Sequence, residues 1–382
     1  MKIVVAPNAF KGSISAKQAA DVMAQAVSEL YPDINTVKVP FSDGGDGLLE
    51  VLRDIMEGSI QKVKVKDPLG REIVSELCIV EKEKIAAIEM ARASGLALLK
   101  KHELDPTKTT TLGTGELIKY ALDLGVKKII IGIGGSATND GGIGVASALG
   151  IRFLDKNGKE LYPCGGNLIK IQDIDLSGLD PRIKECEIVV VCDVDNPLLG
   201  ENGATRVYGP QKGATLKMIE ILEKGLKNLA QIIKRKRGMD ITNIPGGGAA
   251  GGLGAGLYAF LGGKLKKGIE VMKELTSLDE KIKGASLVIT GEGKLDNQIF
   301  FGKGPYGVAE TANKYNVPCI ALCGSIDVNM DFKKARQRGI HGIFTIIPGP
   351  VSLDTAMKNV REYLKDATQR VVAFFVDCIK RA

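Results

Sequence analysis

Four short turns carry carboxylate side chains directly after segments with the apolar pattern of buried strands. They are FSDGGDG at 41–47, VCDVDNP at 191–197, TGEGKLD at 290–296 and a glycine-rich loop around Asp140. Ligands of open α/β sheets bind outside the carboxyl ends of the strands, so we expect these carboxylates to converge on one cleft. Phosphoryl transfer needs such a set, because carboxylates hold Mg²⁺ and one of them accepts the proton of the attacking hydroxyl.

Within these turns we assign Asp296 as the general base and Asp193 as a metal ligand that also takes part in catalysis, with Glu292 as a further metal ligand. The spacing leaves open which carboxylate is the base and which binds the metal. Lysines that stand next to glycine are candidate cations for phosphate, although a solvated surface lysine explains each equally well; they are Lys11, Lys212 and Lys303. We place Lys11 among the catalytic residues.

The loop GIGGSATNDGG at 132–142 directly follows the strand pattern KKIII at 127–131. Glycines in this position let backbone N–H groups approach a phosphate without steric hindrance. A second cluster, PGGGAAGGLGAG at 245–256, is either another phosphate loop or a site of tight helix packing. We assign nucleotide and phosphate binding to a set from both loops and one lysine: Gly134, Gly135, Ser136, Asn139, Lys212, Gly247 and Gly248.

The first glycine loop also permits a second interpretation, a nicotinamide-dependent oxidoreductase. Gly132, Gly134 and Ala137 match the dinucleotide fingerprint G-x-G-x-x-A, and Asp155 lies at about the distance of a ribose-binding acid. Against this, the residues 139–142 interrupt the point where the phosphate-binding helix should begin. A binding protein without catalytic turnover is a third alternative, and ADP release in the presence of an acceptor distinguishes it from an enzyme.

Two stretches of alternating strands and helices must position these turns. A continuous apolar run at 2–6 is typical of a strand buried on both faces, and the helix after it begins with a capping box of Ser15 and Gln18. The C-terminal third repeats this pattern with strands at 286–290, 318–322 and 342–347. Five buried strands separated by helices predict an α/β fold with a doubly wound, flavodoxin-like parallel sheet.

The pattern changes between these two stretches, because residues 60–90 are typical of antiparallel strands joined by turns. We therefore predict a discontinuous flavodoxin-like domain of residues 1–70 and 285–382. Into it is inserted an α+β mixed-sheet domain of residues 71–284, which carries the glycine-rich loops. The two linkers predict a hinge, with catalysis in the cleft between the domains.

Composition restricts the classes of function. The net charge of +7 over 382 residues is diffuse and suits anionic small molecules rather than nucleic acid. Seven cysteines without a C-x-x-C pair predict buried thiols in a reducing compartment, and two histidines leave little for a His-based site. No stretch reaches the length of a membrane span, so we expect a cytoplasmic protein without a membrane partner.

Seven motifs in order resemble the bacterial glycerate kinases of the first class. They are APNAFKGSISA, SDGGDG, GIGGSATNDGG, CDVDNPLLG, GPQKGA, PGGGAAGGLG and TGEGKLDNQ, and together they span most of the chain. The resemblance implies ATP as phosphoryl donor, Mg²⁺, D-glycerate as acceptor and a phosphoglycerate product. Relatives of this class usually resemble makers of 2-phosphoglycerate, although the sequence does not fix which hydroxyl is phosphorylated.

The sequence departs from the commonest family pattern at three positions, with Asp46 in place of a glutamate, Lys294 in place of an arginine and Ile299 in place of a threonine. The lysine keeps the charge but loses the bidentate fork of arginine. We assign substrate binding to Ser13, Asp43, Asp46, Lys294 and Lys303. A homodimer and the pathway context stay open.

Overall fold

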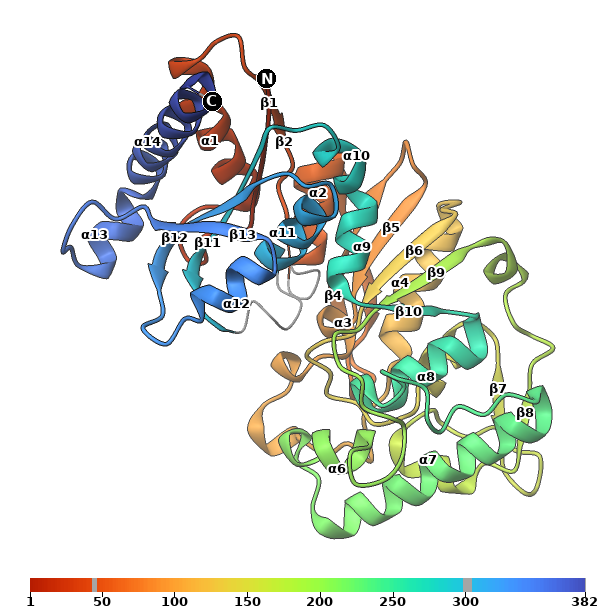
Figure 1. The fold of residues 1–382 in the computed structure, drawn as a ribbon. Helices are drawn as coiled ribbons and strands as arrows, with labels where there is room; N and C mark the ends of the chain where they lie inside the picture. The colour runs from red at the N-terminus through yellow and green to blue at the C-terminus, as the bar shows by residue number, and fades with distance from the viewer. Residues whose placement is uncertain (43–46, 298–303, 382) are drawn as a thin grey trace. The chain divides into compact units, whose positions relative to one another are not determined.

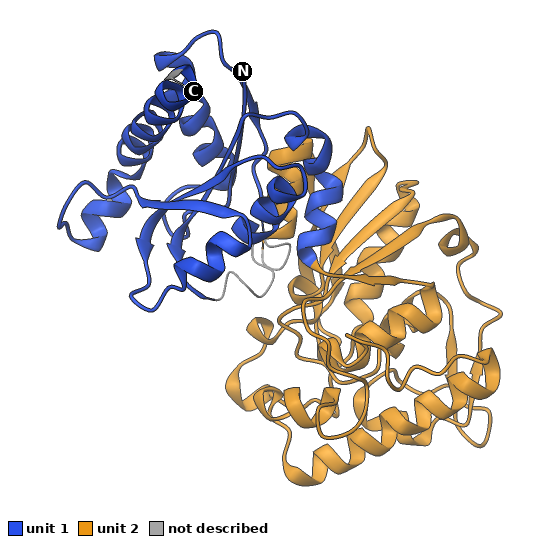
Figure 2. Ribbon diagram, viewed as in Figure 1, with its two compact units in different colours: residues 1–44, 268–382 blue, residues 45–267 orange. Residues whose placement is uncertain are grey.

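The structure, a computed structural model, describes residues 1–42, 47–297 and 304–381. The chain forms two compact units, residues 1–44 with 268–382 and residues 45–267 (Figure 2). The expected boundaries near residues 70 and 284 thus fall inside unit 2 and unit 1, respectively. Residues 45–70 belong to unit 2 because β3 (Ser59–Lys66) pairs along its whole length with β4 (Glu72–Val80).

Unit 1 contains a five-stranded sheet in the order β13-β12-β11-β1-β2, and every pairing in it is parallel. Counted along the chain this order is 2-1-3-4-5, the flavodoxin-like arrangement that the sequence predicted. Register pairs Ile3 with Leu287, and Thr290 Oγ1 donates a hydrogen bond of 2.8 Å to Ala6 O across 284 residues of sequence. The strands are β1 (Lys2–Pro7), β2 (Asn35–Lys38), β11 (Leu287–Leu295), β12 (Cys319–Ile326) and β13 (Ile340–Thr345).

Helices cover both faces of this sheet (Figure 1). Ile3 and Val5 pack with α1 (Ala16–Leu30) and α14 (Val360–Arg381), which lie against each other. The predicted capping box of Ser15 and Gln18 starts α1. On the other face α11 packs on β1, β11 and β12. The remaining helices of unit 1 have these bounds: α9 (Gly268–Leu275), α10 (Leu278–Ile282), α11 (Gly304–Lys314), α12 (Phe332–Gln337) and α13 (Leu353–Lys358).

Unit 2 contains a six-stranded mixed sheet in the order β10-β9-β6-β5-β4-β3. The pairs β3–β4 and β4–β5 are antiparallel, as the turns in the sequence predicted, and the other pairs are parallel. The remaining strands are β5 (Ile85–Glu89), β6 (Lys128–Gly132), β9 (Glu187–Val191), β10 (Lys264–Lys266) and the separate antiparallel pair β7 (Arg152–Leu154) and β8 (Asp173–Asp175).

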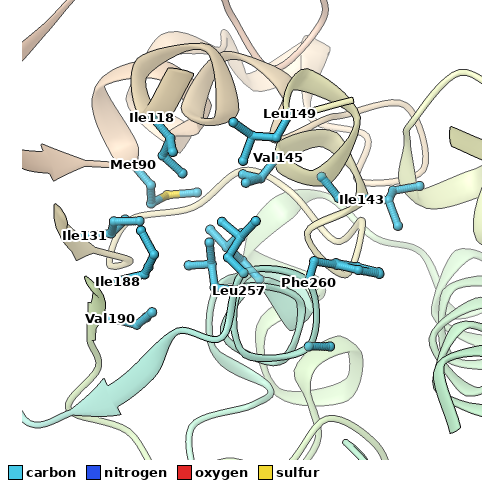
Figure 3. Close-up of a cluster of buried hydrophobic side chains, with 14 of the residues drawn as sticks. Met90, Ile118, Ile131, Ile143, Val145, Leu149, Ile188, Val190, Leu257 and Phe260 are labelled. Atoms are coloured by element: carbon cyan, nitrogen blue, oxygen red, sulfur yellow. The ribbon is translucent and has the colours of Figure 1, made fainter. Parts of the chain in front are cut away.

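The core of unit 2 forms between its sheet and its helices. In Figure 3, Leu257 and Phe260 of α8 share one cluster with Ile143 and Val145 of α5 and with residues of β6 and β9. Phe260 also meets Phe153 edge to face, with ring centroids 5.7 Å apart. The helices are α2 (Leu48–Met56), α3 (Ala91–Ser94), α4 (Leu112–Asp123), α5 (Ile143–Ala148), α6 (Ala204–Tyr208), α7 (Leu216–Arg237) and α8 (Ala249–Leu261), with short 3₁₀ turns between them.

Arg92 joins three elements of unit 2 through ion pairs. Its guanidinium lies 2.6 Å from Glu50 of α2, 2.8 Å from Glu76 of β4 and 2.6 Å from Glu89 of β5. Burial is the largest single influence and lowers the pKa of Arg92, but the hydrogen bonds that its guanidinium donates to Glu89 and Glu50 outweigh burial and raise it. This cluster fastens α2 to the sheet of unit 2.

All seven cysteines are free thiols, as the sequence predicted. Six of them are buried, whereas Cys378 on α14 is exposed, contrary to the expectation that all are buried. None of the helices in the described part of the chain has the length and apolar composition that a membrane crossing requires.

Candidate active site

The carboxyl ends of the unit 1 strands surround a pocket of about 770 Å³. Residues 8–13 follow β1, residues 292–296 end β11, residues 324–325 end β12 and residues 346–347 follow β13. In this strand order the crevice between the ends of β1 and β11 is the place where open α/β sheets bind ligands. The volume is in the usual range for a small-molecule site.

The turn after β1 contributes Lys11 and Ser13 to the pocket. Phe10 anchors the turn with 2% of its side chain exposed, and its N–H donates to Ile14 O at 3.0 Å. Lys11 is exposed. The Ser13 hydroxyl donates to Met357 O at 2.7 Å, which holds α13 against the turn, so this predicted substrate ligand has only acceptor capacity left for a ligand.

The end of β11 contributes Glu292, Lys294 and Asp296 to the same pocket. Side chains two residues apart on a strand point to the same face, which explains why all three reach it. Glu292 is 8% exposed. Lys294 Nζ lies 3.1 Å from the Asp327 carboxylate, and a backbone hydrogen bond from Asn329 together with this lysine lowers the pKa of Asp327.

The pocket therefore gathers five of the residues that the sequence singled out: Lys11, Ser13, Glu292, Lys294 and Asp296. The described residues contain no group of three or more His, Cys, Asp or Glu side chains that could hold a metal ion. Mg²⁺ usually takes one or two carboxylates and completes its shell with phosphate and water, so Glu292 and Asp296 suit it chemically. The predicted ligands Asp43, Asp46 and Lys303 lie outside the described residues.

Asp140, in the glycine loop of unit 2, is a structural residue in this geometry. Its Oδ2 accepts hydrogen bonds from Thr111 N and Thr111 Oγ1, each 2.8 Å long, and from Gly144 N, while Oδ1 accepts from Gly142 N. Burial raises the pKa of the Asp140 carboxyl, and these hydrogen bonds oppose the rise. Because its side chain is 0% exposed, the expectation that Asp140 joins a ligand-binding cleft is wrong.

Lys212 and Asn139 are likewise buried within unit 2 rather than presented to a ligand. Lys212 Nζ donates to Thr138 O at 2.7 Å, and burial lowers its pKa to about 7. The side-chain amide of Asn139 donates to Thr205 Oγ1 at 3.1 Å. Lys212 is 1% exposed and Asn139 0%, so both side chains hold the glycine loop in place in this structure.

Fewer residues of the first glycine loop are exposed than the sequence predicted. Gly134 and Gly135 are exposed, and Gly135 has a left-handed φ of +72°. Ser136 is 6% exposed and forms a bridge with Gly95. Helix α5 begins only at Ile143, so the G-x-G-x-x-A pattern does not open a helix, and the nicotinamide interpretation loses its structural basis.

The second glycine cluster packs against the first. Gly251, with φ +68°, lies so close to the loop that an added Cβ would stand 2.1 Å from Thr138 O. The N–H groups of Gly247 and Gly248 donate to Ile244 O and Asn196 O. Because those two N–H groups already donate to backbone carbonyl groups, they are not directed at a phosphate. Tight packing through small residues explains the cluster.

Asp193 stands just past the end of β9 and is exposed. Its neighbour Asp195 forms an ion pair with Lys267 at 3.3 Å. Among the predicted carboxylates that the structure describes in unit 2, Asp193 therefore remains accessible to a ligand, while Asp140 does not.

Sequence reasoning missed the apolar side of the unit 1 pocket. Ile346 and Ile347 follow β13, and α13 with the residues beside it adds an apolar wall. Apolar residues near a strand end are usually core, so their pattern alone gave no signal of a ligand. The wall residues are Ile346, Ile347, Val351, Leu353, Ala356, Met357 and Val360.

A flavodoxin-like sheet with lysines and carboxylates at its carboxyl edge is typical of α/β enzymes that act on small anionic substrates. The chain belongs to a particular group of them, since the sequence model described as "Glycerate kinase family" matches residues 3–376.

Named relatives match along nearly the whole chain. The chain is 45% identical over 373 residues to the "Glycerate 2-kinase" of Escherichia coli (strain K12), covering 98% of this chain and 97% of that one. It is 46% identical over 369 residues to the "Glycerate kinase" of Halalkalibacterium halodurans, covering 97% of each. A crystal structure of a candidate glycerate kinase 2 from Salmonella typhimurium LT2 superposes with a TM-score of 0.89 at 43% identity, covering 100% of both chains.

Proposed function

We propose that this protein is a glycerate kinase of the first class, which transfers the γ-phosphoryl group of ATP to D-glycerate with Mg²⁺ and forms 2-phosphoglycerate. The observation that carries the proposal is the 45% identity over 373 residues to a protein named glycerate 2-kinase. The pocket of unit 1 supports it, because its lysines and carboxylates are the groups that phosphoryl transfer to an alcohol requires.

The charged residues of the pocket each have a task in the proposed reaction. Asp296 accepts the proton of the attacking hydroxyl, which makes the oxygen a stronger nucleophile as the new bond to phosphorus forms. Lys11 offers a positive charge to the phosphoryl oxygens, where negative charge is concentrated. Lys294 is a weaker anion ligand, since its charge is shared with Asp327 at 3.1 Å.

Glu292 is the proposed metal ligand of this pocket, and Asp193 of unit 2 is a separate candidate metal ligand. The Mg²⁺ ion, when bound, neutralises charge on the phosphates. Glu292 is 8% exposed, whereas Asp193 is exposed. Asp193→Asn tests whether the second carboxylate takes part.

The decisive experiment is ³¹P NMR of the product formed from ATP and D-glycerate, with and without Mg²⁺. We expect a single phosphomonoester coupled to the C2 proton, and no product after the metal is removed. Asp296→Asn should lower kcat by a factor of about 100 or more, because a positioned base contributes roughly that much. Glu280→Gln, on the exposed surface of unit 1, is the matched control.

Three outcomes would contradict parts of the proposal. Phosphate on the C3 oxygen would mean that the product is 3-phosphoglycerate. A near-normal kcat in Asp296→Asn would mean that Asp296 is not the general base. Binding of ATP and glycerate without turnover would instead favour a binding protein.

A further inference from the structure

The unit 1 pocket has two chemically different sides. One side carries polar and charged groups from the ends of β1 and β11, among them Lys11, Glu292 and Asp296. The other side is aliphatic and consists of residues 346–347 and the segment 351–360 around α13. A pocket of about 770 Å³ with such a division suits a ligand that is apolar at one end and anionic at the other.

D-Glycerate does not match this division. It is a three-carbon acid with a carboxylate and two hydroxyls, and every carbon of it carries oxygen, so it has no surface that gains by leaving water for an aliphatic wall. A nucleoside triphosphate does match, because its flat base is apolar on both faces and its phosphates are anionic.

The described wall is held in place by the fold. The Ser13 hydroxyl donates to Met357 O at 2.7 Å, which fastens α13 to the turn after β1. Gly12 in this turn has φ +78°, a backbone conformation that favours glycine, and the Met357 side chain packs beside it. Ile346 and Val360 are 1% and 5% exposed, whereas Leu353 at the rim is 74% exposed. The inner part of the apolar wall is thus buried in the fold, and its outer end at Leu353 is exposed to solvent.

The residues that the sequence assigned to the nucleotide are poorly placed for it. Lys212 and Asn139 are buried and bonded inside unit 2, and the N–H groups of Gly247 and Gly248 are used within the chain. Gly134 and Gly135 are exposed, and an added Cβ at Gly134 would meet no atom within 4 Å.

Building on the proposed function, we propose that the unit 1 pocket holds the nucleoside of ATP, with the base against the aliphatic wall and the phosphates directed to Lys11 and the carboxylate side. The pocket predicted to bind the acceptor is then a donor site. Aliphatic contact with the base supplies affinity through burial, and Lys11 supplies it through charge.

Ala356→Phe tests this placement, because a ring on the inner side of α13 occupies the space of the base. We expect the Kd of ADP, measured by calorimetry without glycerate, and the KM of ATP to rise by about tenfold or more, while the KM of glycerate changes less than about twofold. The matched control is Lys358→Phe, which adds the same ring to an exposed position of the same helix outside the pocket lining. It should leave all three values unchanged.

Leu353→Asp provides a second test that does not depend on core packing, because 74% of this side chain is exposed. A carboxylate at the mouth should weaken ADP binding in the same direction. If either variant raises the KM of glycerate and leaves ADP binding intact, the pocket holds the acceptor and the proposal is overturned. If both leave nucleotide and glycerate binding intact, it is overturned as well.

The binding measurement separates this inference from the proposed function. Wild-type protein that binds ADP, loses it in Ala356→Phe and yet forms no phosphoglycerate would support the pocket and refute the kinase. If the wild type forms phosphoglycerate and both variants keep its KM for ATP, the kinase activity is supported and the placement of the nucleoside in the unit 1 pocket is refuted.

Discussion

The buried ammonium group of Lys212 should make the free energy of unfolding depend on pH. Its side chain is 1% exposed, its Nζ donates to Thr138 O, and burial lowers its pKa from 10.5 to about 7 while the nearby Asp140 carboxylate opposes the shift. Replacement by methionine keeps the length of the side chain and removes the charge.

The direction in which the stability changes with pH follows from the protons bound by the folded and unfolded chains. The folded-state pKa lies below the unfolded value, so between pH 7 and 10.5 the unfolded chain binds more protons at this residue, and stability rises with pH. The full difference corresponds to at most about 5 kcal/mol, with a slope of up to about 1.4 kcal/mol per pH unit. At and below pH 7 the wild type carries the whole penalty, and above 10.5 it carries none.

Urea unfolding of wild type and Lys212→Met at intervals from pH 7 to 10 measures this effect. The variant loses one hydrogen bond to Thr138 O, worth about 1 kcal/mol at every pH, and should lack the rise that the wild type shows. Lys217→Met, an exposed position in the following helix α7, is the control and should follow the wild type. Parallel curves for wild type and Lys212→Met would refute the reasoning, because they would mean that the ammonium is solvated.

Three further changes test the glycine loop and its surroundings. Asp140→Asn should lower the free energy of unfolding by about 3 kcal/mol, since an amide nitrogen then faces donors that the carboxylate accepted; loss of turnover without loss of stability would instead make it catalytic. Gly135→Ala should cost about 1–2 kcal/mol through its left-handed φ, whereas Gly134→Ala, whose Cβ meets nothing within 4 Å, should leave Tm unchanged; equal Tm values would contradict the strain. Arg92→Met should cost about 2 kcal/mol in urea unfolding by leaving three carboxylates without their cation, with Arg92→Lys between it and wild type; an unchanged midpoint would show that the ion pairs are solvated.

The sequence predicted the sheet of unit 1 well because its strands are buried on both faces. Ile3, Val4 and Val5 are all 0% exposed, and a run of apolar residues is sufficient to identify such a strand. The domain boundary was harder, because the sequence of β3 shows that it is a strand but not which strand pairs with it. Pairing with β4 assigns it to unit 2.

The polar half of the unit 1 pocket was also predictable, since Lys11, Glu292 and Asp296 stand beside strand ends. The burial of Lys212 and Asn139 was not. A glycine-rich loop predicts that something approaches the backbone closely, and the sequence does not distinguish a phosphate from another segment of the same chain. Here Gly251 makes that approach to Thr138 O.

The central strand pair of unit 1 has a consequence for synthesis on the ribosome. Ala6 of β1 accepts a hydrogen bond from Thr290 of β11, which is translated 284 residues later. At 5–20 residues per second this interval lasts roughly 15–60 s. During that time the contiguous unit 2 can fold behind an N-terminal segment whose strand still lacks β11. We therefore expect nascent chains that stop before β11 to bind chaperones through residues 1–44, and to be released once the C-terminal third has emerged.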